Sequence, residues 1–150
     1  MSIADREEAA SGLDPQSMIA LVEAFPDHIA ASARAAAGLD LPSAAPPEAV
    51  IVSGLGGSAI AGDLALAIAG ARLEIPLLVL REYTLPAWVG PRTAVVASSY
   101  SGNTEETLGA YDQARRAGAR IVCISSGGEL SRRARADGFP LLPLPGGFPP

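Results

Sequence analysis

Residues 93–107 read TAVVASSYSGNTEET, an apolar run followed by a turn of serine and glycine and then by the start of a charged helix. The run from Thr93 to Ala97 is typical of a buried strand, because it is continuously apolar rather than alternating. A second unit of this form lies upstream, where Val50 to Val52 lead into SGLGGS at 53–58. Short apolar strands that alternate with helices predict an α/β fold with a doubly wound parallel sheet.

The sequence around these two units supplies the other elements of a five-stranded sheet. A helix is expected at 58–71, with Ile60, Leu64 and Ile68 on one face, and further strands are expected at 75–80, 120–124 and 141–142. Eight residues are predicted to form the strand core: Val50, Ile51, Val52, Val95, Val96, Ile121, Val122 and Ile124.

The helix that follows the serine-rich turn carries recognisable end signals. Asn103 and Glu106 are predicted to form a capping box at its start. Arg115 and Arg116 suit the negative end of the helix, and Gly118 closes it. A shorter helix is predicted at 129–136, ending near Gly138.

A helical segment is predicted ahead of the sheet. Asp14 is expected at the N-cap with Pro15 in the first helical position, and Pro26 separates this helix from an alanine-rich one that ends near Gly38. Three prolines between Leu41 and Glu48 indicate a linker. The predicted organisation is therefore a helical segment with a linker at 1–48 and one α/β domain at 49–150.

Composition excludes several classes of function. The chain has 150 residues, a hydrophobic share of 49% and a net charge of −5, and its 11 basic residues are all arginine. The acidic balance argues against a nucleic-acid partner. The lack of lysine removes Schiff-base chemistry and the lysine of phosphate-binding P-loops.

Metal, disulfide and membrane signals are also weak in the sequence. The single cysteine, Cys123, excludes an internal disulfide, and the single histidine, His28, excludes a metal site built from several histidines. No metal or cofactor is therefore expected. No signal peptide and no apolar run of about 18 residues is visible, so we expect no membrane partner and a cytoplasmic location.

Two polar loops are expected at the carboxyl ends of neighbouring strands. Each places glycines and hydroxyl groups at a helix N-terminus, where unpaired backbone N–H groups and the helix dipole favour an anion. The hydroxyls belong to Ser58, Ser99, Ser101 and Thr104. The pair predicts a phosphate cradle without a cation, although each loop by itself is also explained as a turn and a helix cap.

Other motif assignments explain only one loop. Gly54, Gly56 and Ala59 match the dinucleotide fingerprint, but the acidic residue that should follow would be Glu82, which comes late. The serine-rich loop is similar to the phosphate loop of flavodoxins, yet it follows the third strand. A serine hydrolase is excluded, because Ser58 is not followed by the required glycine.

Both loops in this order resemble the SIS (sugar isomerase) domain family, and especially the N-terminal domain of bifunctional phosphoglucose/phosphomannose isomerases. The resemblance rests on GLGGSAIAGD at 54–63 and SYSGNTEET at 99–107, supported by SSGG at 125–128 and PGGFPP at 145–150. It implies a flavodoxin-like parallel sheet and a sugar phosphate as ligand. A phosphosugar-sensing regulatory module and a nucleotide-binding domain are the alternatives.

The resemblance also assigns roles to individual residues. Ser58, Ser99, Ser101 and Thr104 would contact the sugar phosphate, while Gly56 and Gly57 would let the backbone approach it. Family members interconvert glucose 6-phosphate or mannose 6-phosphate with fructose 6-phosphate through an enediol-like intermediate, and a homodimer is implied.

The catalytic groups of the family are expected outside this sequence. The base is a glutamate in a second domain of the same fold, and an arginine follows the proline pair that corresponds to Pro149 and Pro150. The second domain and that arginine are absent from these 150 residues, so the chain alone is expected to be inactive. Glu105 and Glu106 are interpreted as first-turn helix residues rather than as the base.

Overall fold

The computed structural model describes residues 14, 18–42 and 45–148. The predicted start of the first helix at Pro15 and the proline pair at the end of the sequence lie outside these residues. The elements in chain order are α2 (Met18–Glu23), α3 (Phe25–Ala37), β1 (Ala49–Ser53), α4 (Gly57–Ala69), the short 3-10 helix η1 (Gly70–Arg72), β2 (Leu77–Leu80), β3 (Thr93–Ser98), α5 (Glu105–Arg116), β4 (Arg120–Ser125), α6 (Gly128–Asp137) and β5 (Leu141–Pro143).

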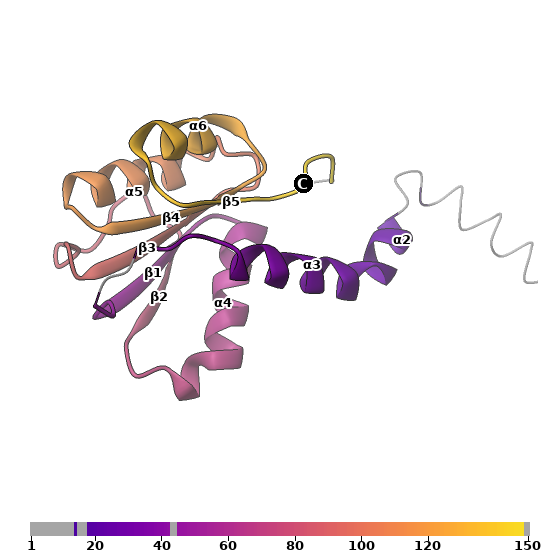
Figure 1. Cartoon of the computed structure of the whole chain (residues 1–150), viewed down its shortest axis with the longest axis horizontal. Coiled ribbons are helices and arrows are strands. Elements are labelled where there is room, and N and C mark those ends of the chain that lie inside the picture. Colours follow the sequence, from indigo (N-terminus) through magenta and orange to yellow (C-terminus); the bar gives the residue numbers. More distant parts are fainter. Residues whose placement is uncertain (1–13, 15–17, 43–44, 149–150) are drawn as a thin grey trace, which may run out of the picture. The chain divides into compact units, whose positions relative to one another are not determined.

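The strands form one parallel sheet in the order β2-β1-β3-β4-β5 (Figure 1). Val52 of β1 lies in register with Val79 of β2 and Val96 of β3, and Val96 in turn with Val122 of β4. This order reverses direction between β1 and β3, which is the switch point of the flavodoxin-like doubly wound fold. The predicted fold class is confirmed.

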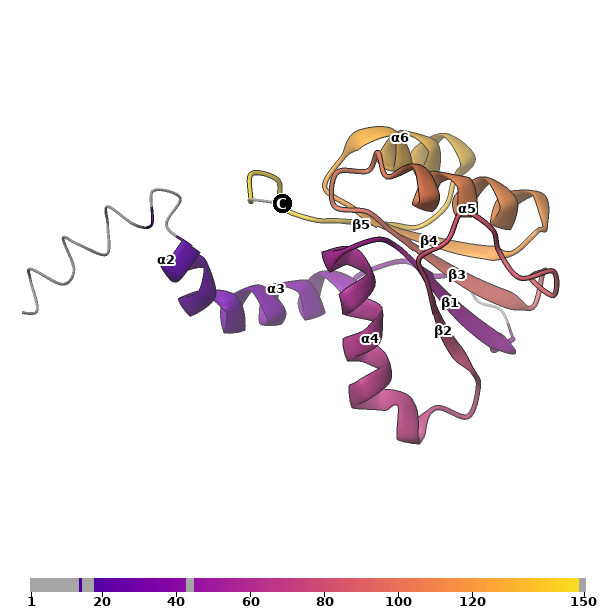
Figure 2. The ribbon, with the colours of Figure 1, turned by 180° about the vertical axis from the view of Figure 1, so that it is seen from behind.

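The two faces of the sheet are covered unequally. Helices α5 and α6 lie over one face and α4 over the other, as the two opposite views show (Figures 1 and 2). Under α5 and α6 the side chains of Ile51, Val95 and Ile121 are at most 2% exposed, and they pack with Tyr111 and Leu130 from the helices. The hydrophobic core therefore lies mainly on the α5–α6 side.

The eight residues predicted to form the strand core differ in their burial, and none of them is exposed. Ile51, Val52, Val95 and Ile121 are buried, whereas Val50, Val96, Val122 and Ile124 are only half-buried. Burial alternates along β3 and β4, because the face opposite α5 and α6 is covered by α4 over β1 and β2 alone.

The C-terminal end of α5 follows the sequence signals. Gly118 has a φ of +70°, and its N–H donates to the carbonyl of Arg115 at 3.1 Å, while the N–H of Ala119 donates to the carbonyl of Ala114 at 2.9 Å. These two bonds close the helix in a Schellman motif, in which glycine adopts the left-handed conformation at low cost. The predicted helix end at Gly118 is confirmed.

The N-terminal helices form a unit of their own. The carboxylate of Asp14 accepts hydrogen bonds from the N–H groups of Met18 at 2.7 Å and Ile19 at 2.9 Å, four and five residues on, whereas an N-cap side chain bonds two or three residues on. Ala24 separates α2 from α3, and Pro26 lies in the first turn of α3. The α/β unit runs from Leu39 to Phe148, so its first residues lie upstream of the boundary predicted at residue 49. None of the helices in the described part of the chain is long and apolar enough to cross a membrane.

Candidate functional site at the carboxyl edge of the sheet

The glycine-rich loop after β1 and the serine-rich loop after β3 lie next to each other. Their strands are neighbours in the sheet, and both strands end at the same edge. The Ser58 hydroxyl, in the first turn of α4, accepts a hydrogen bond from the N–H of Tyr100 at 3.3 Å. The two predicted walls of the cradle are therefore joined by a direct contact.

Two of the predicted site hydroxyls bond to each other. Ser99 is 2% exposed, and its Oγ lies 2.8 Å from Oγ1 of Thr104. The Ser99 hydroxyl also accepts a hydrogen bond from the N–H of Gly102 at 3.1 Å. Ser99 is thus the internal brace of the serine-rich loop, and Thr104 is the half-buried residue that couples this brace to α5.

The other predicted site residues lie on the open side of the loops. Ser101 is exposed, and its hydroxyl accepts a hydrogen bond from the N–H of Asn103 at 3.2 Å. Gly56 and Gly57 are exposed as well, and no atom beyond their chain neighbours lies within 4 Å of the positions where their side chains would begin. A ligand can therefore reach the backbone of the glycine-rich loop.

A third loop, residues 125–128 after β4, holds the serine-rich loop in place. The N–H and the hydroxyl of Ser126 both donate to the Tyr100 carbonyl, at 3.1 Å and 2.6 Å. The N–H of Leu130 donates to the Gly102 carbonyl at 2.8 Å. Sequence reasoning gave this loop no role in the site, and its only signal was the serine–glycine run that supported the family resemblance.

The serine-rich loop and the 125–128 loop also approach each other closely. Gly102 has a φ of +70°, and a side chain there would collide with the carbonyl oxygen of Gly127. Gly128 has a φ of +66°, and a side chain there would meet the carbonyl oxygen of Ser101. The backbones interlock at a separation that only glycine allows.

The capping box predicted at Asn103 is wrong. The N-cap of α5 is Thr104, and its backbone has an extended conformation. The Asn103 Oδ1 instead accepts a hydrogen bond from the N–H of Glu129 at 3.0 Å, at the start of α6. Asn103 therefore serves the contact between two loops rather than the helix that follows it.

The electrostatics of the site come from backbone rather than from cationic side chains. No lysine or arginine occurs at 53–58 or 98–104. In the described structure no side chain caps α4 or α5, so their first-turn N–H groups remain available to an anion. The carboxylates of Glu105 and Glu106 lie beside Tyr83, whose pKa is raised, chiefly by the charge of Glu106.

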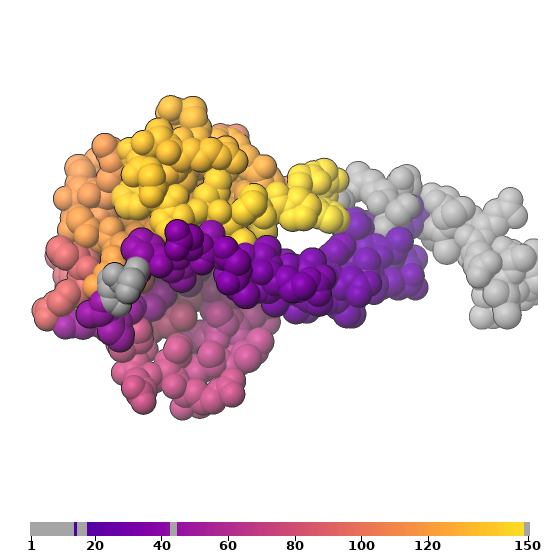
Figure 3. Space-filling model, in the orientation of Figure 1, coloured from indigo at the N-terminus to yellow at the C-terminus, as the bar shows by residue number. Residues whose placement is uncertain are grey.

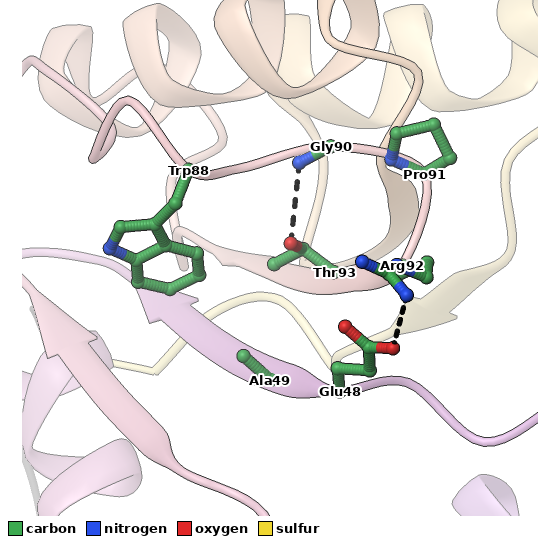
Figure 4. A pocket seen from close by; sticks show the side chains of 7 residues that line it. All are labelled: Glu48, Ala49, Trp88, Gly90, Pro91, Arg92 and Thr93. Carbon is green, nitrogen blue, oxygen red and sulfur yellow. Dashed lines mark hydrogen bonds and ion pairs between the residues drawn. The ribbon is translucent and has the colours of Figure 1, made fainter.

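A separate hollow of about 430 Å³ lies at the opposite, amino-terminal edge of the sheet (Figure 4). Its charged groups, Arg92 and Glu48, form an ion pair at 2.6 Å, and the Thr93 hydroxyl accepts a hydrogen bond from the N–H of Gly90 at 3.3 Å. Because these polar groups already have partners, this hollow is less suited to a phosphate than the loops at the carboxyl edge.

Comparison with known proteins supports the predicted resemblance. No family model matches the chain. A bifunctional phosphoglucose/phosphomannose isomerase from Caldicellulosiruptor bescii is 50% identical over 101 residues, which are 67% of this chain and 30% of that protein. The same-named enzyme from Aquifex aeolicus is 39% identical over 106 residues, 70% of this chain and 33% of that protein.

Two further proteins extend the comparison. A D-glucosamine-6-phosphate 4-epimerase from Sulfolobus acidocaldarius is 38% identical over 110 residues, 73% of this chain and 34% of that protein. The solved structure of a phosphoheptose isomerase from Francisella tularensis matches the fold with a TM-score of 0.53 and 17% identity, over 97% of this chain and 87% of that one.

These matches confirm the resemblance to phosphoglucose/phosphomannose isomerases and the predicted fold. The chain spans about a third of the length of the curated relatives that it matches.

Proposed function

We propose that residues 49–150 form the phosphosugar-binding domain of an aldose–ketose isomerase that interconverts glucose 6-phosphate or mannose 6-phosphate with fructose 6-phosphate. The observation that carries the proposal is the bond between Ser58 and Tyr100, which joins two anion-favouring helix N-termini into one cradle. The names of the relatives support the choice of substrates. A cytoplasmic homodimer is part of the proposal.

Each cradle residue has a distinct role in this proposal. Ser101 and Thr104 donate hydroxyl hydrogen bonds to the phosphate oxygens, and Ser58 binds at the boundary between the two loops. The exposed backbone of Gly56 and Gly57 lies against the sugar. Ser99 acts through the loop, because its hydroxyl is already engaged by Gly102 and Thr104.

The cradle binds and orients the substrate but does not move its protons. Isomerisation transfers a proton between C1 and C2, and it needs a base within about 3 Å of that proton. The nearest carboxylates in sequence, Glu105 and Glu106, lie beside the Tyr83 hydroxyl instead. We therefore assign the base to a second domain of the intact enzyme, and binding by the cradle alone does not lower the barrier.

Calorimetric titration tests the binding part of the proposal. Fructose 6-phosphate should bind, whereas fructose and NAD should not. The double variant Ser101→Ala, Thr104→Ala should bind at least about a hundredfold more weakly, since each of the two hydrogen bonds to a charged group contributes roughly 1.5–3 kcal/mol. Ser32→Ala, an exposed serine on α3, is the matched control and should not change the affinity. Equal affinity of the double variant and the wild type for fructose 6-phosphate would contradict the proposed phosphate cradle.

The relative named as an epimerase supports a second candidate substrate. Its name gives D-glucosamine 6-phosphate, which shares the hexose 6-phosphate group with the substrates above. A parallel titration with glucosamine 6-phosphate separates the two candidates: tighter binding of the amino sugar than of fructose 6-phosphate would favour epimerase-type chemistry.

A further inference from the structure

Tyr100 forms hydrogen bonds with three different segments of the chain. Its N–H donates to the Ser58 hydroxyl at 3.3 Å, and its carbonyl accepts two hydrogen bonds from Ser126, at 3.1 Å and 2.6 Å. Its phenol oxygen accepts a hydrogen bond from the N–H of Phe148 at 2.9 Å, 48 residues further along the chain. The contact with Phe148 brings a further segment to the serine-rich loop.

That segment, here called the strap (residues 144–148), runs from β5 back toward the cradle. The N–H of Leu144 donates to the Ser125 carbonyl at 2.9 Å, at the end of β4, and Phe148 then bonds to Tyr100, which follows the end of β3. The strap therefore crosses the ends of β4 and β3 in turn. The next strand of the sheet is β1, and neighbouring strands lie about 4.8 Å apart. This path leads to the boundary between the two loops of the cradle.

The middle of the strap is open to solvent. Pro145, Gly146 and Gly147 are exposed, and no atom beyond their chain neighbours lies within 4 Å of the positions where side chains of the two glycines would begin. The space-filling view shows the chain beyond β5, in yellow, standing out from the α/β unit (Figure 3). Tyr100 and Phe148 are half-buried, so their contact holds the far end of the strap against the serine-rich loop.

The Tyr100 hydroxyl still has a hydrogen to donate. A phenol hydroxyl can accept one hydrogen bond and donate another at the same time. Here it accepts the bond from Phe148, and none of the residues that the structure describes accepts its hydrogen. Because the N–H of Phe148 occupies one lone pair of the oxygen, it restricts the directions in which the hydroxyl hydrogen can point. A donor oriented in this way loses less conformational freedom when it binds a ligand oxygen.

We propose that the Tyr100 hydroxyl, oriented by the N–H of Phe148, donates a hydrogen bond to the sugar part of a bound sugar phosphate. The phenol reaches to the strap, where no described helix begins and residues 141–150 include no lysine or arginine. These surroundings suit a neutral sugar oxygen rather than a phosphate. Tyr100 therefore determines the preference of the site for a sugar phosphate over bare phosphate. This inference rests on the proposed phosphosugar function.

NMR titrations with fructose 6-phosphate and with inorganic phosphate test this role. The wild-type chain should bind fructose 6-phosphate more tightly than phosphate. Tyr100→Phe should weaken fructose 6-phosphate binding about fivefold to tenfold and leave phosphate binding unchanged, whereas Ser101→Ala should weaken both. Tyr83→Phe, at an exposed tyrosine that follows β2, is the matched control and should change neither affinity. An equal loss for both ligands in Tyr100→Phe would overturn the proposal, and so would no loss at all.

Two substitutions at position 148 test whether the strap orients the hydroxyl. Phe148→Pro removes the backbone N–H and should weaken fructose 6-phosphate binding at least about threefold. Phe148→Leu keeps the N–H and should bind like the wild type. Combining Phe148→Pro with Tyr100→Phe should cause no further loss beyond Tyr100→Phe alone, because the N–H acts through the phenol. Wild-type affinity in Phe148→Pro would contradict the orienting role of the strap.

Amide hydrogen exchange tests the contact between Tyr100 and Phe148 without any ligand. The N–H of Phe148 should exchange faster in Tyr100→Phe than in the wild type. The N–H of Leu108, which donates to the Thr104 carbonyl at 3.0 Å, should exchange equally in both and serves as the control. Unchanged exchange at Phe148 would overturn the contact. Faster exchange in the variant, together with a wild-type chain that binds neither ligand, would instead refute the proposed function and with it the role of Tyr100 in sugar binding.

Discussion

The Ser58 hydroxyl accepts a hydrogen bond from the N–H of Tyr100 at 3.3 Å, across 42 residues of sequence. Ser58 starts α4, and Tyr100 lies in the loop that leads to α5. One serine therefore fixes the distance between the N-termini of two helices. In the proposed function this distance determines whether a single phosphate can reach both.

Removing this hydroxyl should separate the two walls of the cradle. Ser58→Ala is expected to weaken fructose 6-phosphate binding by about tenfold and to cost roughly 1 kcal/mol of unfolding free energy, because a part-buried N–H loses its acceptor. Calorimetry and urea denaturation measure the two effects. Ser58→Thr keeps a hydroxyl and should retain most of the affinity; if both variants bind like the wild type, Ser58 does not organise the site.

The two serines of the SYSGN run should respond differently to alanine. Ser99→Ala should lower the unfolding free energy by roughly 1–3 kcal/mol, because its buried hydroxyl satisfies Gly102 and Thr104. Ser101→Ala should change stability by less than about 0.5 kcal/mol, because Ser101 is exposed. Urea denaturation of both variants provides the comparison, and equal losses would contradict the assignment of Ser99 as the internal brace.

Alanine at Gly102 should be far more damaging than alanine at Gly118. Both glycines have a φ of +70°, so both substitutions carry a similar backbone strain of about 1 kcal/mol. A side chain at 102 also collides with the Gly127 carbonyl, whereas one at 118 meets only Pro91 at an ordinary 3.7 Å. Thermal unfolding should show a clear excess loss for Gly102→Ala, and losses of equal size would mean that the two loops separate easily.

Acid should weaken the contact between α5 and α6 through Glu129. Its carboxylate accepts hydrogen bonds from Arg132 at 2.6 Å and Arg133 at 2.7 Å, and Arg133 also bonds to Asp112 of α5 at 2.7 Å. Arg132, followed by Arg133, lowers the pKa of Glu129 from its ordinary 4.5 to about 2. Because the folded-state pKa is the lower one, the stabilisation is present above pH 4.5 and is lost as the pH falls toward 2.

The glutamine variant isolates this contribution. Urea midpoints of the wild type and Glu129→Gln should differ most near neutral pH and converge toward pH 2. High salt should reduce the difference in part, because Arg132 is exposed whereas Glu129 and Arg133 are half-buried. Glu74→Gln, at an exposed carboxylate in the loop before β2, should leave the urea midpoints at acidic pH unchanged. A constant difference between wild type and Glu129→Gln at every pH would show that Glu129 acts by packing alone.

Local signals in the sequence were sufficient for the sheet and for the helix ends. Continuous apolar runs located all five strands, and Gly118 marked the end of α5 because a left-handed residue is needed there. Asn103 was misassigned because its side chain bonds to Glu129, 26 residues away. A contact of that kind leaves no trace in the spacing of nearby residues.

Periodicity also cannot tell which side of a helix is covered. Ile60, Leu64 and Ile68 lie on one face, as expected, yet that face is the exposed one, because Ala59 and Gly62 occupy the contact with the sheet. In the same way, Val95 and Val96 are equivalent in sequence, but only Val95 lies under α5 and α6. The difference arises from the number of helices over each face, which is a property of the whole fold.

The close approach of the two loops at Gly102 and Gly128 affects how much conformational entropy is lost when a ligand binds. A loop that must be ordered by its ligand uses part of the contact energy to offset lost conformational freedom, at about 1–2 kcal/mol for each backbone residue that is fixed. Here the neighbouring loop has already fixed the serine-rich loop through the hydrogen bonds that Ser126 and Leu130 donate to the carbonyls of Tyr100 and Gly102. The conformational entropy of the serine-rich loop is lost on folding rather than on binding. Nearly all of the hydrogen-bond energy to a bound anion therefore appears as affinity, and association does not require the loop to rearrange.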